Sequence, residues 1–125
     1  MGDESSRYAD GLTRMQTIFG PSVEAELQRL ASTSPDLARV LVEFPFADIY
    51  SRPALDIKTR EMLTVAALTV LGFPQGELNQ HIRAALNVGC TREEILEIIL
   101  QMAVYAGFPA ALEAAKTAAT VFRET

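Results

Sequence analysis

The chain has 125 residues, of which 49% are hydrophobic and 22% are charged, and its formal net charge is −5. At this length we expect a single domain that spans residues 1–125 and buries roughly two-thirds of its surface without metals or disulfides. The acidic balance argues against nucleic acid as a partner, because phosphate binding requires clustered lysine and arginine. No apolar stretch reaches the roughly 18 residues of a membrane span. The single cysteine, Cys90, cannot form an internal disulfide, so a cytoplasmic location is expected.

Hydrophobic residues recur at three- and four-residue steps along the chain, which predicts an all-α fold. The first helix is expected from about residue 4 to 19, with Gly20 ending it. A second helix follows this turn, and Ser34 can cap a third. Pro45 lies inside the apolar segment that comes next, so we expect a kink or break near Glu43.

The second half of the chain predicts four more helices. Asp56 can cap IKTREMLTVAALTVLG, which is apolar almost all round and is therefore expected to be a central, buried helix. The next helix emerges from the turn GFPQG and ends where Gly89 can adopt the left-handed conformation. A capping box from Thr91 to Glu94 opens another helix, and the last helix begins near Pro109.

His81 is the only histidine of the chain, and Glu77 lies four residues before it. Residues four apart on a helix project from the same face, so the two side chains can share one pocket. Histidine is the side chain that ordinarily exchanges protons near neutral pH, and a neighbouring carboxylate can orient its ring. The pair is therefore a candidate acid–base site. A simple surface pair of no catalytic role fits the same spacing.

Two other kinds of site fit the sequence poorly. A metal site is not expected, because one histidine without a second histidine or cysteine nearby provides too few ligands for zinc. A nucleophilic serine is weakly supported, since the chain has no Gly-x-Ser-x-Gly turn. No cofactor is expected.

Five short motifs have an order and spacing that resemble the carboxymuconolactone decarboxylase family. They are SRPALDIKTRE (51–61), ELNQH (77–81), HIRAALNVG (81–89), TREEI (91–95) and YAGFPAA (105–111). The resemblance covers nearly the whole chain. It implies an AhpD-like fold of about six to seven helices and assembly into a homohexamer built as a trimer of dimers.

The same superfamily contains alkylhydroperoxidase-like proteins, which use a Cys-x-x-Cys pair followed by a histidine. In this chain Pro74 and Glu77 stand at the two cysteine positions, and Cys90 lies beyond the histidine. Reduction of peroxides by a dithiol is therefore not expected. This departure favours the decarboxylase branch.

The resemblance implies a cofactor-free lyase that removes carbon dioxide from γ-carboxymuconolactone, in the β-ketoadipate pathway of aromatic catabolism. The unsaturated lactone accepts the released electrons itself, so the protein supplies a proton donor, an oxyanion stabiliser and a cation for the carboxylates. We expect His81 to act as the general acid and Glu77 to orient it.

Four further residues form the predicted substrate-binding set. Arg52 and Arg60 are candidates for binding carboxylates, because a guanidinium binds such groups at two points. Tyr50 can add a hydroxyl or an aromatic wall, and Glu61 matches an acidic position that is frequent in the wider family. Each has a structural alternative, which is a loop or subunit contact for Arg52, core packing for Tyr50, and solvated charge for the other two.

Two other interpretations stay open. The chain fits a relative recruited to another cofactor-free decarboxylation, cyclisation or isomerisation in a biosynthetic pathway. It also fits a non-catalytic oligomer that binds a small acid. In every case the apolar run 95–105 and the alanine-rich last helix are expected subunit contacts, because so short a chain cannot cover all its apolar helix faces.

Overall fold

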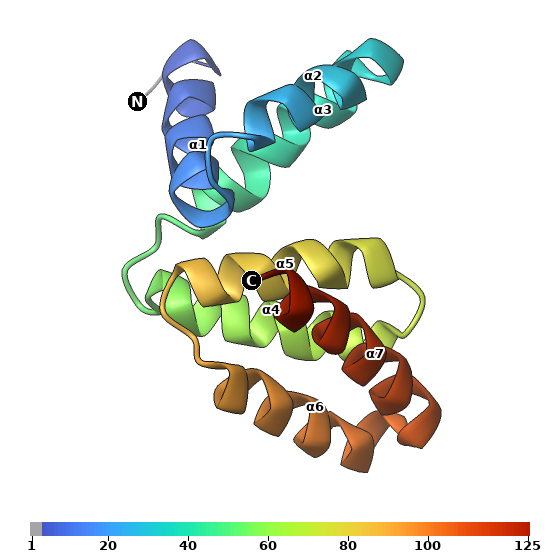
Figure 1. Ribbon diagram of the computed structural model, residues 1–125. Helices are drawn as coiled ribbons and strands as arrows, with labels where there is room; N and C mark the ends of the chain where they lie inside the picture. Colours follow the sequence, from blue (N-terminus) through green and yellow to red (C-terminus); the bar gives the residue numbers. More distant parts are fainter. Residues whose placement is uncertain (1–3) are drawn as a thin grey trace. The chain divides into compact units, whose positions relative to one another are not determined.

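The computed structural model describes residues 4–125, which form seven α-helices and one π-helix without any strand (Figure 1). The predicted all-α fold is confirmed. By its contacts the chain divides into two compact units, of which the first ends at Asp56 and the second runs from Ile57 to Thr125. A single domain spanning both units stays a prediction.

The first unit is a group of four helical segments in which α1 packs against η1 and α2 packs against α3. Their bounds are α1 Glu4–Phe19, α2 Val23–Thr33, α3 Pro35–Leu41 and η1 Val42–Ile49. Gly11 allows α1 and η1 to lie in close contact, since a Cβ built at this glycine would lie 2.3 Å from the Val42 carbonyl oxygen. Ile18 and Val42 are fully buried in this unit.

The helix containing Pro45 changes type where a break was expected. From Val42 the backbone widens into a π-helix, and the Tyr50 N–H donates to the Pro45 carbonyl, five residues earlier, at 2.8 Å. In an α-helix the proline ring clashes with the carbonyl of the preceding turn, and a wider turn relieves that clash. The predicted kink or break near Glu43 is thus a change of helix type that begins one residue earlier.

Glu43 of η1 is buried between two arginines. Its Oε1 lies 3.5 Å from Nη1 of Arg7 and 3.2 Å from Nη1 of Arg39. Arg7 also donates from Nε to Oδ1 of Asp48 at 2.9 Å, and this hydrogen bonding holds the pKa of Asp48 below its ordinary value. These charges join α1, α3 and η1.

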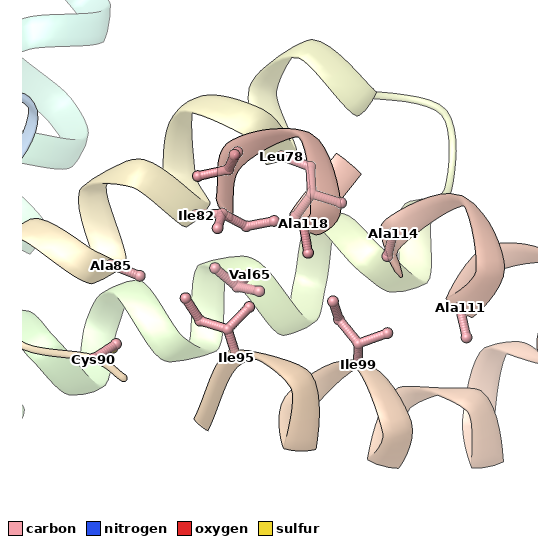
Figure 2. Packing of buried hydrophobic residues seen from close by; sticks show 11 residues of the cluster. Val65, Leu78, Ile82, Ala85, Cys90, Ile95, Ile99, Ala111, Ala114 and Ala118 are labelled. Carbon is pink, nitrogen blue, oxygen red and sulfur yellow. The ribbon is translucent and has the colours of Figure 1, made fainter. Parts of the chain in front are cut away.

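The second unit contains four helices, and α4 contacts all of the other three. Their bounds are α4 Ile57–Leu71, α5 Gln75–Asn87, α6 Arg92–Ala106 and α7 Phe108–Glu124. Figure 2 shows the buried side chains of the four helices pointing toward one another. They include Val65, Leu78, Ile82, Ile95, Ile99, Ala111, Ala114 and Ala118. The small side chains of α7 therefore serve the unit's own core, because alanine permits close helix packing.

The helix ends follow the predicted signals. Ser34 accepts a hydrogen bond from the Leu37 N–H at 3.2 Å, and Gly89 has a φ of 107°. The Thr91 hydroxyl accepts from the Glu94 N–H at 3.0 Å, and the Glu94 carboxylate accepts from the Thr91 N–H at 2.9 Å. The capping box is confirmed. Its backbone hydrogen bond to the carboxylate keeps the pKa of Glu94 below the ordinary value.

Helix α4 is central but it is not buried on every face. Its fully buried residues are Glu61, Val65 and Thr69, whereas the apolar Leu63 and Leu71 are exposed. The expectation of a helix buried all round is wrong, because the neighbouring helices of the unit cover only part of the surface of α4. In the part of the chain described, none of the helices combines the length and hydrophobicity needed to cross a bilayer.

Candidate active site

A buried carboxylate meets the single histidine at the contact between α4 and α5. Oε1 of Glu61 lies 2.7 Å from Nδ1 of His81. The Glu61 side chain is 0% exposed and the His81 side chain is 12% exposed. The two groups are at hydrogen-bonding distance, and an ionised carboxylate would accept this hydrogen bond from a proton on Nδ1.

Packing of the two helices fixes this pair. On α4, Glu61 shares one face with Val65 and Thr69, and that face is fully buried. On α5, Leu78 is held in the core, and His81 follows it by three residues, which places both on one side of the helix. The rigid elements that carry the two side chains therefore preset their distance and orientation.

Glu77 lies on the other side of the imidazole ring. Its Oε2 is 4.0 Å from Nε2 of His81, and its side chain is 64% exposed. This distance exceeds that of a direct hydrogen bond. The predicted pair thus shares a helix face, but Glu61 and not Glu77 lies at hydrogen-bonding distance from the ring.

The other predicted site residues are distributed over both units. Arg60 is half-buried on α4, next to Glu61 in sequence. Tyr50 belongs to the first unit, where its ring centroid lies 5.0 Å from that of Phe46. Arg52 also belongs to the first unit and is exposed. Substrate binding by Tyr50, Arg52 and Arg60 stays a prediction.

Arg83 and Cys90, which follow His81 in the sequence, have structural partners. Arg83 donates to Oδ1 of Asn79 at 3.0 Å and to Oε2 of Glu124 at 2.6 Å. Cys90 is buried, with its Sγ 4.0 Å from the Lys58 carbonyl oxygen. Among the described residues, no group of three or more His, Cys, Asp and Glu side chains is arranged to hold a metal ion.

The partnership between Glu61 and His81 does not follow from the sequence pattern. The two residues are 20 apart and lie on different helices. Glu61 stands four residues before Val65 and eight before Thr69, which puts the three on one helix face. Because α4 is apolar in almost every direction, however, periodicity cannot identify this face as the buried one.

One family model and three relatives relate the chain to known proteins. The model described as carboxymuconolactone decarboxylase family matches residues 35–120. The chain is 36% identical to 4-carboxymuconolactone decarboxylase of Acinetobacter baylyi, over 125 residues that cover 99% of this chain and 92% of that protein.

Two other relatives match most of the chain. It is 34% identical over 112 residues to an uncharacterized 15.0 kDa protein of Paracoccus denitrificans, covering 88% of this chain and 84% of that one. It is 31% identical over 109 residues to nitrosuccinic acid decarboxylase of Metarhizium robertsii, covering 86% of this chain and 75% of that protein. Two of the three relatives therefore bear the names of decarboxylases.

Proposed function

Because the chain belongs to the carboxymuconolactone decarboxylase family, we propose that it decarboxylates a small unsaturated acid, with γ-carboxymuconolactone as the first candidate substrate. The single observation that carries the proposal is the shielded pair of Glu61 and His81, 2.7 Å apart. Such a pair can hold a proton ready for delivery to carbon without a metal or a thiol.

The first step breaks the bond between the ring carbon and its carboxylate. The electron pair of that bond enters the conjugated system of the lactone and reaches the carbonyl oxygen, and carbon dioxide leaves. The lactone is therefore the electron sink, and the intermediate is a dienolate. What the protein must supply is stabilisation of the developing oxyanion and a proton for carbon.

His81 is proposed to deliver that proton from Nε2. When both ring nitrogens carry protons, the imidazolium is stabilised by the Glu61 carboxylate at Nδ1. Donation from Nε2 leaves a neutral ring that is still bound to Glu61 through Nδ1–H. One proton is consumed for each molecule of carbon dioxide released, and no oxidant or reductant is required.

Arg60 is the residue of the second unit that we propose to bind a substrate carboxylate. It precedes Glu61 on α4 and is half-buried, and its guanidinium suits two-point binding of such a group. Neutralising the substrate in this way would offset the repulsion that two neighbouring glutamates exert on an anionic lactone.

The test is a spectrophotometric assay of decarboxylation, with enzymatically generated γ-carboxymuconolactone as the substrate. We expect turnover by the native chain and a loss of about 10²–10⁴-fold in His81→Gln. Glu97→Gln, on an exposed position of α6, is the control and should turn over normally. No carbon dioxide from the native chain would reject this substrate, and equal rates in His81→Gln would reject the role of the imidazole.

Nitrosuccinate is a second candidate, because a relative that is 31% identical is named as its decarboxylase. A nitro group accepts the electron pair of the adjacent carbon as a conjugated lactone does, and the resulting anion again needs a proton on carbon. Both substrates therefore require His81 to donate a proton to carbon. Comparison of kcat/KM for the two acids separates them. Turnover of neither would favour the two other interpretations, a relative recruited to another cofactor-free reaction or a non-catalytic binding protein.

A further inference from the structure

We propose that Glu77 relays protons between bulk water and Nε2 of His81, while Glu61 holds the ring from the other side. The inference rests on the proposed function, because it describes how the proton donor is reloaded between turnovers. It changes the role that the sequence suggests for Glu77, which was orientation of the ring.

The two carboxylates differ in exposure and in the nitrogen that they face. Glu61 faces Nδ1 at 2.7 Å and is 0% exposed, so water cannot reach it directly. Glu77 faces Nε2 at 4.0 Å and is 64% exposed, so the same side chain approaches both the ring and the solvent. One acid is suited to holding the imidazole, and the other is suited to exchanging its proton.

The gap of 4.0 Å fits a relay better than a fixed hydrogen bond. A permanent bond at Nε2 would compete with the substrate for the proton. A movement of about 1 Å brings the two atoms to hydrogen-bonding distance, and rotation of the exposed Glu77 side chain provides it. One bridging water can also connect them without that movement. Because the two residues are four apart on α5, Glu77 stays on the same helix face as His81 when its side chain rotates.

His81 must be reprotonated after each turnover, and only 12% of its side chain is exposed to water. After donation to the dienolate, Nε2 has a lone pair and the ring is neutral. Glu77 takes a proton from water or a buffer acid and passes it to Nε2, which regenerates the imidazolium and the Glu77 carboxylate. The sum of the steps is one solvent proton transferred to the product carbon in each turnover.

The experiment uses the fact that His81 is the only histidine. Labelling histidine with ¹⁵N gives signals from one ring, and NMR measures how fast the proton on Nε2 exchanges with water at low buffer concentration. At a pH where both nitrogens are protonated, we expect exchange at Nε2 to be about tenfold slower in Glu77→Gln than in the native chain. Acetate should restore it, because a small acid can replace the missing carboxyl group.

Two further variants make the result specific. Glu97→Gln removes the same charge from an exposed position of α6 and should leave the exchange rate unchanged. Glu77→Asp keeps the carboxyl group on a shorter side chain and should fall between native and Glu77→Gln. Equal exchange in the native chain and Glu77→Gln, or equal slowing in Glu97→Gln, would overturn the relay.

This measurement needs no substrate, so it stands apart from the test of decarboxylation. In an active preparation, Glu77→Gln should retain the rate of the first turnover and lose later turnovers at low buffer, with recovery as acetate is added. A first turnover slowed as much as the later ones would also overturn the relay. Failure of the native chain to release carbon dioxide would reject the proposed reaction and leave the exchange result to be judged by itself.

Discussion

Gly11 lies in the middle of α1, where the carbonyl oxygen of Val42 leaves no room for a side chain. We expect Gly11→Ala to lower the free energy of unfolding by about 1–3 kcal/mol, because the two helices must move apart. Urea denaturation followed by circular dichroism measures this change. Gly76→Ala on α5 is the matched control, since a Cβ there meets nothing within 4 Å and should leave stability unchanged or raise it.

If Gly11→Ala and Gly76→Ala unfold at the same urea concentration, the result would contradict the close contact between α1 and η1 at Gly11. The comparison is fair because both glycines lie within helices and neither has a positive φ.

Glu61 is the residue whose substitution should most directly alter the donor strength of His81. In Glu61→Gln the side chain keeps its size but loses the negative charge that stabilises the imidazolium. We expect kcat for decarboxylation to fall by about 10²-fold with a smaller change in KM, since the interaction acts on proton transfer more than on binding. Steady-state kinetics checks this, with circular dichroism to verify folding.

Acetate separates the two glutamates in the same assay. It should not restore Glu61→Gln, because the buried position is closed to solvent, whereas it should restore Glu77→Gln. Recovery of Glu61→Gln by acetate would contradict the division of roles between them.

At the scale of helices, Glu94 links the start of α6 to α4. Its carboxylate accepts from the Thr91 N–H and lies 3.3 Å from Nζ of Lys58. Its pKa in the folded chain is below the ordinary value of 4.5, so its contribution to stability is present above that pH and is lost as the pH falls below it. Glu94→Gln should therefore unfold more easily than the native chain at neutral pH.

The difference should shrink as the pH falls from 4.5 through the lowered pKa of Glu94, because the native side chain then loses its charge and resembles the neutral glutamine. Urea titrations at several pH values measure it. Glu97→Gln, within the same helix, should show no such dependence. A difference between native and Glu94→Gln that stays constant down to strongly acidic pH would refute this reading of the cap.

Most helix boundaries could be predicted from the sequence, whereas two features of the helices could not. Capping residues and glycines act locally, so Ser34 and Gly89 mark helix ends without knowledge of the fold. The π-helix around Pro45 and the buried face of α4 depend on neighbouring helices. The same division applies to the site, because the identity of His81 is a sequence feature and its pairing with Glu61 is a tertiary one.

At the scale of the whole molecule, α6 presents an apolar stripe formed by Leu96, Leu100 and Val104 at four-residue spacing. All three are exposed although α6 packs against α4 and α7 through its other faces. We propose that a second copy covers this stripe, because such a patch is unfavourable in water. The last helix is the weaker candidate, since its buried alanines are used within the unit.

Light scattering after size exclusion tests this assembly, with an oligomer expected for the native chain. Leu100→Glu should shift it to a smaller species, because a charge would be buried in the contact. Gln101→Glu adds the same charge at an exposed neighbouring position outside the stripe and should keep the native size. A native monomer at micromolar concentration would contradict the proposal.

Glu61 is also a position where thermal stability and catalytic activity favour different residues. A carboxylate with no exposed surface needs polar partners such as the His81 imidazole, and apolar side chains of similar volume commonly stabilise such positions. Directed evolution for thermal endurance alone would thus be drawn to replace Glu61 and His81 together. A laboratory that wants a hardier catalyst must therefore screen every generation for turnover, or the first gains in endurance will discard the proton donor.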